Sequence, residues 1–236
     1  HIKPQTANQY SLGYYGSTKD RVFDFFTEIY YKSMNNVIDY IDNADLFLNP
    51  NIETQVRSGT GEAYGIEFLL EKKKGKFNGF LSYTWSNTER TIEGVNNSRS
   101  YPTTFNKQHN ISTTFSYEFS ERFSVSSVFK FTSGGYITLP EGTFNFYGAA
   151  FNYYSERNGY RLPAYHRMDI SANLKSKKNT NRKWQGEWSF GVYNLYNRKN
   201  IFSLFVKQSN DDLSFNKAYK MYLYGTSPYI SYNFKF

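Results

Sequence analysis

Apolar and polar residues alternate with a period of two along most of the chain. In residues 167–174 one parity is apolar and the other is polar; the apolar positions are Met168, Ile170, Ala172 and Leu174. Such alternation predicts β-strands with one apolar and one polar face. It predicts about nine strands and no helix, with the strands at residues 10–14, 23–32, 66–71, 76–85, 110–119, 123–132, 167–174, 184–192 and 230–236.

These strands fit either a soluble sheet protein, in which the apolar face is a core, or a transmembrane barrel, in which that face contacts lipid and the polar face lines a wet lumen. Many segments exceed the roughly 5–6 residues of soluble strands and approach the ~9–11 that cross a bilayer. Aromatic residues also mark segment ends, as they do in the girdles of outer-membrane barrels. These residues are Tyr31, Trp85, Trp184, Tyr196 and Phe236.

The connections between the predicted strands alternate in length. The short turns are Gly16–Asp20, Lys73–Gly75, Ser120–Glu121 and Ser176–Arg182. The long loops are Asp42–Ser58, Thr91–Phe105, Leu139–Pro163 and Gln208–Asn216. Short periplasmic turns and long external loops are typical of transmembrane barrels. The sequence therefore predicts an all-β, antiparallel transmembrane β-barrel in a bacterial outer membrane, with the long loops on the cell exterior.

The composition limits other functions. Tyr 23, Phe 22 and Trp 3 give an aromatic share of 20% in 236 residues, which a disordered chain does not have. No run approaches the ~18 consecutive apolar residues of a membrane helix. The chain has no cysteine, which excludes disulfides and thiolate metal sites. The net charge of +8 raises the question of a polyanionic partner.

Lysines cluster at two of the short turns, Lys72–Lys76 and Lys175–Lys178. Basic residues near aromatics suit nucleic acid, but on the inner rim of a barrel they suit anionic headgroups, at about 1 kcal/mol for each lysine near the surface. We favour contact with outer-membrane lipid and expect no nucleic-acid partner.

Groups for catalysis or metal binding are sparse. His109 and His166 lie on predicted strands, without a second ligand at a metal-site spacing. Carboxylates on the polar parity, such as Glu67 and Asp169, are more often members of ion pairs or solvated rows than catalysts. No Gly-x-Ser-x-Gly elbow is present. We expect no enzyme activity, no metal and no cofactor.

The strand count also bears on completeness. If the last strand ends in the periplasm, nine strands give the first strand the same direction, and an odd number does not close a bacterial barrel. At about 26 residues per strand, a 22-stranded barrel with a plugged lumen needs roughly 570 residues. We expect residues 1–236 to be the C-terminal portion of such a barrel, with its plug and N-terminal strands absent from this sequence.

Several motifs, in order along the chain, resemble those of TonB-dependent outer-membrane receptors. Gly59–Lys72, with its Ala-Tyr-Gly-Ile-Glu run, resembles one strand of that family. The further matches are Leu81–Ser86, Asn106–Ile111, Arg161–Asp169, Val192–Asn200 and Pro228–Phe236. The Tyr-, Asn- and Lys-rich style is similar to receptors from the Bacteroidota that carry a carboxypeptidase-like regulatory domain.

The resemblance implies a receptor that actively imports a scarce nutrient and is energised by the TonB complex through a plug that this sequence lacks. One alternative is a receptor-like barrel that acts as a scaffold subunit of a larger outer-membrane complex, and another is a passive porin. An iron chelate, a vitamin, a glycan and a peptide all remain open as substrates.

Two groups of residues are candidate sites. The Leu139–Pro163 loop carries an aromatic cluster that either contacts a ligand or a surface lipoprotein, or forms a mini-core that holds the loop together: Phe144, Phe146, Tyr147, Phe151, Tyr153 and Tyr154. The chain end, with Tyr232, Phe234 and Phe236, resembles the signal read by the barrel-assembly machinery, which captures an edge strand by strand addition. Alternatively, Phe236 only anchors the last strand at the inner interface.

Overall fold

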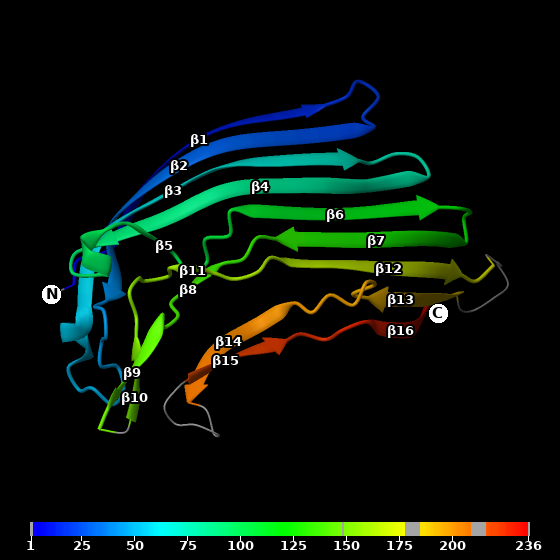
Figure 1. Cartoon of the computed structure of the whole chain (residues 1–236). Coiled ribbons are helices and arrows are strands. Elements are labelled where there is room, and N and C mark those ends of the chain that lie inside the picture. Colours follow the sequence, from blue (N-terminus) through cyan, green and yellow to red (C-terminus); the bar gives the residue numbers. More distant parts are fainter. Residues whose placement is uncertain (1, 148, 178–184, 209–215, 236) are drawn as a thin grey trace.

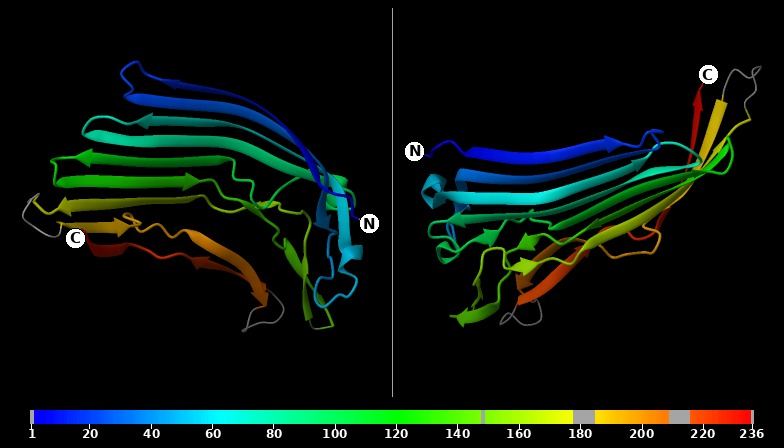
Figure 2. Two further views of the ribbon diagram at one scale, coloured as in Figure 1. Left: turned by 180° about the vertical axis from the view of Figure 1, so that it is seen from behind. Right: turned by 90° about the horizontal axis from the view of Figure 1, so that it is seen from above.

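The computed structural model describes residues 2–147, 149–177, 185–208 and 216–235. Within them, nine strands form an antiparallel wall in the spatial order β1-β2-β3-β4-β6-β7-β12-β13-β16. Their bounds are β1 (Thr6–Ser17), β2 (Phe23–Tyr40), β3 (Val56–Lys72), β4 (Phe77–Ile92), β6 (His109–Glu118), β7 (Phe123–Thr132), β12 (Tyr165–Lys175), β13 (Gln185–Tyr193) and β16 (Ser227–Lys235). The wall is curved, with β1 and β16 at its edges (Figures 1 and 2).

Short strands lie at the end of the wall that carries the long loops, opposite the short turns (Figure 1). They are β5 (Tyr101–Pro102), which pairs with β4, and the pairs β8 (Tyr136–Ile137) with β11 (Tyr160–Arg161), β9 (Gly142–Phe146) with β10 (Ala149–Tyr153), and β14 (Ile201–Gln208) with β15 (Asn216–Tyr222). Two short 3-10 helices span Ile52–Gln55 and Asn96–Ser98. In the described part of the chain, no helix has the length and apolar character needed to cross a membrane.

The nine predicted strands each overlap one wall strand, although Trp184 and Phe236 lie outside the described residues. Several strands are longer than predicted: β2, β3 and β4 have 18, 17 and 16 residues. A strand needs only about 9–11 residues to cross a bilayer. The strands β2–β4 are therefore longer than a membrane crossing requires, and their ends opposite the short turns carry long loops, which we call the outer loops.

The strand register confirms the predicted parities. Residues directly opposite one another form an apolar row across five strands, which consists of Leu12, Ile29, Ile66, Trp85 and His109. The adjacent row, on the other face, consists of Gly13, Glu28, Glu67, Thr84 and Asn110. A slip of one residue in any pair would mix the two sets, so the alternation fixes the register.

The apolar face is not a protein core. Its side chains are half-buried to exposed, with Phe68 on the inner strand β3 at 37% of full exposure and Leu12 on the edge strand β1 at 73%. Among the described residues, the buried hydrophobic side chains are only Val37, Ile92, Val95 and Tyr101, at the outer end of the wall. An uncovered apolar face of this extent is what a bilayer covers. The membrane interpretation therefore holds, and the soluble one is wrong.

Aromatic bands bound this face at both ends. Near the loops, the rings of Tyr64 and Trp85 lie 5.8 Å apart, and those of Tyr83 and His109 lie 6.2 Å apart. Near the short turns, the rings of Phe77 and Phe115 stack at 5.3 Å. The eight residue steps from Phe77 to Trp85 on β4 span about 27 Å at ~3.4 Å per residue. That length matches an apolar band of roughly 25 Å for strands that tilt.

The long connections differ in detail from the predicted loops. The β2–β3 loop is shorter than Asp42–Ser58, because β3 already begins at Val56. The last connection is longer than Gln208–Asn216, because it includes the hairpin β14–β15, whose tip at 209–215 lies outside the described residues. This hairpin was not predicted, because Ile201–Gln208 lacks a clean period of two.

Candidate functional site

Three outer loops meet over a small core at the ends of β2, β3 and β4 that carry them. The core forms because a bulge at Asn36, which has a φ of 55°, shifts the register of β2 and turns Val37 toward Ile92. Val95 and Tyr101, from the β4–β6 loop, complete this core. The loops thus have buried contacts of their own and do not depend on the membrane for their structure.

Arg157, in the β7–β12 loop, links all three loops. Its Nη2 atom donates hydrogen bonds to Asp42 Oδ1 at 3.1 Å, at the start of the β2–β3 loop, and to the carbonyl of Tyr40, the last residue of β2, at 2.9 Å. Its backbone N–H donates to Asn96 Oδ1 in the β4–β6 loop, and the Asn96 N–H donates to Asp42 Oδ2 at 2.8 Å. Because Arg157 and Asp42 belong to different loops, these bonds make the three loops one unit, which we call the loop cluster.

Asp39 extends the loop cluster into the core. It lies 3.7 Å from Arg157 Nη1 and accepts a 2.7 Å hydrogen bond from the Tyr101 hydroxyl. Burial raises the pKa of Tyr101 well above its ordinary value, and the hydrogen bond to the Asp39 carboxylate raises this pKa further. Tyr101 therefore stays a neutral donor across the physiological range.

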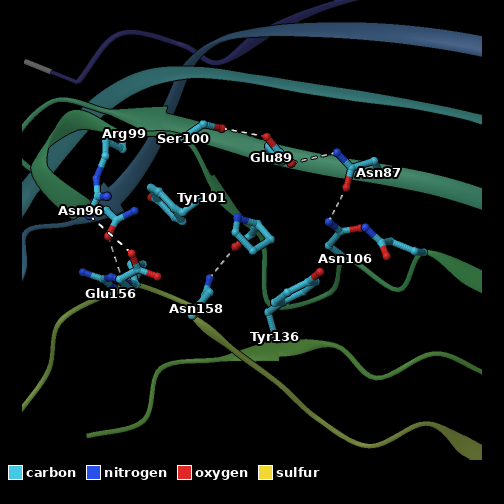
Figure 3. Close-up of a pocket in the computed structure, with 14 residues that line it drawn as sticks. Asn87, Glu89, Asn96, Arg99, Ser100, Tyr101, Asn106, Tyr136, Glu156 and Asn158 are labelled. Carbon is cyan, nitrogen blue, oxygen red and sulfur yellow. Dashed lines mark hydrogen bonds and ion pairs between the residues drawn. The ribbon is translucent and has the colours of Figure 1, made fainter. Parts of the chain in front are cut away.

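Two cavities flank Arg157. The first, of about 310 Å³, lies between the outer end of β4 and the β4–β6 and β7–β12 loops (Figure 3). The second, of about 290 Å³, lies between the β2–β3 and β7–β12 loops and is lined by Tyr40, Leu46 and Tyr154. Both volumes fall near the lower end of the range for small-molecule sites, roughly 300–1,000 Å³.

The predicted aromatic cluster lies on the hairpin β9–β10 and the residues that flank it. Phe144 stacks on Phe151 at 5.7 Å, and Phe146 meets Tyr147 edge to face at 4.6 Å. All six predicted residues are nevertheless exposed, Tyr147 at 96%. The rings contact one another and are also exposed, so the contact-surface and mini-core interpretations both stay predictions. In Figure 1 the hairpin lies at the loop end of the wall.

The predicted assembly signal lies on β16, an edge strand that pairs only with β13 among the described strands. Tyr232 contacts Trp188 at 4.7 Å and lies 6.2 Å from Phe234. Tyr232 lies on the apolar face, because it is directly opposite Trp188. Phe234 has the same parity on β16 and so lies on the same face. Phe236 lies outside the described residues.

The lysines of the β3–β4 turn interact mainly with the protein itself. Lys72 Nζ donates to the carbonyls of Lys74 and Phe77, and Lys74 Nζ donates to the Asp20 carbonyl at 2.6 Å. Lys73 pairs with Asp24, and the hydrogen bond to that carboxylate raises the pKa of Lys73. Lys73 and Lys74 thus connect the β3–β4 turn to the β1–β2 turn and the start of β2. Contact with lipid would be additional to this structural role.

Asp169 and the two strand histidines, His109 and His166, have structural partners. Arg167 pairs with Asp169 at 2.8 Å, and Asp169 also accepts the backbone N–H of Asn194. His109 Nδ1 lies 3.0 Å from the Tyr83 hydroxyl, and His166 Nδ1 lies 2.7 Å from that of Tyr196. Within the described ranges, no three His, Cys, Asp or Glu side chains are grouped as a metal site would require.

An antiparallel wall with an uncovered apolar face, aromatic bands and long loops at one end defines a segment of a bacterial outer-membrane β-barrel. The chain belongs to the TonB-dependent receptor family, because residues 1–195 match the family described as "TonB dependent receptor-like, beta-barrel". Members of this family are typically non-enzymatic transporters of the bacterial outer membrane.

Solved structures agree on the fold. The ferric-catecholate import receptor Fiu of E. coli K12 superposes with a TM-score of 0.60 at 13% identity, over 99% of this chain and 28% of the receptor. The ferripyoverdine receptor of the Pseudomonas aeruginosa outer membrane superposes with a TM-score of 0.59 at 15% identity, over 85% of this chain and 25% of the receptor. The chain thus spans about a quarter of these receptors and matches the C-terminal part of the barrel. A search of curated proteins gave no match.

Sequence reasoning missed the loop cluster. The alternating pattern carries no information on these residues, because they lie outside the predicted strands: Arg157, Asp39 and Asp42. Arg157 and Asp42 are also 115 positions apart in the sequence. The sequence did indicate a turn at Asn158-Gly159, directly after Glu156 and Arg157. The structure has this turn, with a φ of 51° at Asn158, and the turn positions the preceding Arg157.

Proposed function

We propose that the chain is the C-terminal part of the barrel of a receptor that actively imports a scarce nutrient and is energised by the TonB complex. The observation that carries this proposal is the loop cluster: three loops held by Arg157, with two cavities and an exposed aromatic hairpin beside them. A pore that only lets solutes diffuse has no need for preorganised loops, whereas a receptor does, because preorganisation lowers the cost of binding.

The wider protein follows from family membership. We propose that a plug and the remaining barrel strands lie in the part of the receptor outside residues 1–236, that the plug contacts TonB, and that the whole barrel has about 22 strands. We also propose that the receptor is of the Bacteroidota type with a carboxypeptidase-like regulatory domain, which rests on the Tyr-, Asn- and Lys-rich style of the chain.

The sites are assigned as follows. The aromatic hairpin, with Phe144, Phe146, Tyr147, Phe151, Tyr153 and Tyr154, contacts the ligand or a surface lipoprotein that covers the barrel. The chain end, with Tyr232, Phe234 and Phe236, is the signal for the barrel-assembly machinery. The apolar face and the inner rim contact outer-membrane lipid.

The test is a deletion of the hairpin. Replacing Gly142–Tyr153 by a short Gly-Ser linker should abolish TonB-dependent uptake of the ligand and leave the barrel folded, since loops lie outside the wall's hydrogen-bond ladder. Tyr147→Ser is the milder version. Tyr224→Ser is its matched control, because Tyr224 is a similarly solvated aromatic, 89% exposed, that follows β15 and lies outside the loop cluster. Equal effects of both substitutions would contradict a specific role for the hairpin.

The second candidate is a scaffold subunit of a larger outer-membrane complex, and the exposed rings of the hairpin favour it as well, because exposed aromatics suit protein partners. The same deletion separates the two functions. Normal growth on the nutrient, together with loss of a co-purifying protein, would favour the scaffold over the import receptor.

A further inference from the structure

The last strand of the wall, β16, is joined to its neighbour β13 by a long connection, residues 194–226, which contains the hairpin β14–β15 (Figure 1). A tight turn fixes the register of the two strands that it joins, but a connection of this length does not. The alternation of apolar and polar residues excludes a slip of one residue. It does not exclude a slip of two, because Ile230, Tyr232 and Phe234 would stay on the apolar face. The register of β16 therefore needs a further determinant.

Two glycines of β13 are covered by tyrosine rings of β16. Tyr229 is directly opposite Gly191, and a methyl group on Gly191 would lie 2.6 Å from the Tyr229 hydroxyl oxygen. A methyl group on Gly186 would lie 2.7 Å from the ring of Tyr232. Side-chain carbons do not come this close to other atoms, so each ring occupies the space that a larger residue would fill. We call Gly186 and Gly191 the covered glycines.

The covered glycines lie on opposite faces of the wall. Gly186 has the parity of Trp188, so Tyr232 covers it on the apolar face, where it also contacts Trp188 at 4.7 Å. Gly191 has the other parity, so Tyr229 covers it on the polar face. The strand β16 is thus held to β13 by one aromatic ring on each side of the wall.

We propose that Tyr229 and Tyr232 set the register of the last strand through the covered glycines. An aromatic ring that lies over a glycine of the neighbouring strand pins the register of the pair. The observed register is the one in which both rings lie over a glycine. After a slip of two residues, Tyr229 would be opposite Ser189 or Tyr193, and the side chain there would take the space of the ring.

The same arrangement recurs in two further strand pairs that long loops join. Tyr30 of β2 is directly opposite Gly65 of β3, and its hydroxyl oxygen would lie 2.9 Å from a methyl group on that glycine. Phe115 of β6 is directly opposite Gly79 of β4, and its ring would lie 2.9 Å from a methyl group there. The fourth such pair, β7 and β12, has no glycine in either strand. The pair β13–β16 differs from the others in having a covered glycine on each face.

The register of β16 matters because this strand is an edge of the wall. A slip of two residues would move β16 by about 7 Å along β13. The open edge of β16 would then be offered at a different depth to any strand that pairs with it. This inference concerns the folded wall and does not depend on the import function.

The experiment reads the register with pairs of cysteines in the full-length receptor, oxidised in isolated outer membranes, with any other cysteine of the receptor replaced by serine. Ser189→Cys with Ser231→Cys joins positions that are directly opposite and reports the observed register. Ser189→Cys with Asn233→Cys, and Glu187→Cys with Ser231→Cys, join positions that become opposite after a slip of two in either direction. Diagonal positions lie roughly 7–8 Å apart, too far for a disulfide, so each pair reports one register.

With both tyrosines present, we expect the first pair to cross-link and the two slipped pairs not to. Tyr229→Ser together with Tyr232→Ser should raise the ratio of slipped to observed cross-links at least about tenfold, because two aromatic cross-strand contacts are lost. Tyr229→Phe with Tyr232→Phe keeps both rings and should keep the observed register. Phe190→Ser is the matched control, because it removes a ring from the same strand pair at a position that is opposite Ile230 and covers no glycine.

The inference is overturned if the serine variants do not raise the slipped cross-links, or if Phe190→Ser raises them equally. Tyr229→Ser alone carries the same expectation with a smaller rise, so the test remains decisive if the double variant fails to assemble. Tyr229 also lies outside the predicted assembly signal, which separates the two roles. A fall in the amount of receptor with an unchanged register would assign Tyr232 to the assembly signal alone and contradict this inference.

Discussion

The guanidinium of Arg157 lies 3.1 Å from the carboxylate of Asp42, although 115 positions separate them in the sequence. Asp42 is the second residue of the loop between β2 and β3, and Arg157 belongs to the loop between β7 and β12. Because Asp42 also accepts the backbone N–H of Asn96, three loops share one ion pair. The outer loops of this barrel segment are therefore coupled through two side chains.

Arg157→Ala should loosen all three loops together. The substitution removes hydrogen bonds between charged groups, each worth about 1.5–3 kcal/mol, and leaves Asp39 and Asp42 without their cation. Hydrogen exchange at residues 41–55, 93–100 and 154–159 should quicken by roughly 10- to 150-fold, while exchange in the wall strands stays unchanged. Arg99→Ala is the control: both side chains of the Arg99–Glu156 pair are more than half exposed, so its loss should cost under about 1 kcal/mol. Faster exchange in one loop only would show that the loops are independent.

The two faces of the wall should respond differently to a new charge. Phe190 lies opposite Ala172 and Ile230 on the apolar face, whereas Glu187 lies opposite Lys175 on the polar face. Phe190→Arg should cost ~2–4 kcal/mol, because an arginine near the membrane midplane contacts lipid. Glu187→Arg should cost less, because water solvates it. Heat-modifiable gel mobility reports the folded fraction, and equal losses would mean that β13 has the opposite orientation.

The raised pKa of Tyr101 makes the stability of the folded protein fall at high pH. A tyrosine ordinarily titrates near pH 10. Because the folded protein holds the Tyr101 proton more tightly than the unfolded chain does, the stability from this group is complete below about pH 10 and falls as the pH rises toward the folded pKa.

The measurement is the difference between the ultraviolet titrations of the wild type and of Tyr101→Phe. The phenolate signal of Tyr101 should be absent near pH 10 and emerge only at higher pH. Asp39→Asn should lower this pKa only in part, since burial is the larger cause. A Tyr101 signal that emerges near pH 10 would contradict the buried position of this ring.

The strands of the wall were predictable from the sequence, because the alternation of apolar and polar residues that defines a strand lies within one short segment. A period of two fixes which side chains share a face, and the rows from Leu12 to His109 follow once the strands pair in sequence order. The loop cluster was not predictable, because Arg157 and Asp42 meet only after the wall has placed their loops side by side. The bulge at Asn36 is a similar case: it breaks the parity of β2, and a pattern that expects strict alternation ends the strand before Val37.

The orientation of the wall is the most direct test of the account, since every assignment above needs the long loops outside. The chain has no cysteine, so single cysteines can be placed at Tyr147, on the tip of the aromatic hairpin, and at Lys74, in the β3–β4 turn. An impermeant thiol reagent added to intact cells should label Tyr147→Cys, and it should label Lys74→Cys only after the outer membrane is permeabilised. Labelling of Lys74→Cys but not Tyr147→Cys in intact cells would contradict the orientation, and with it the placement of the loop cluster on the cell exterior.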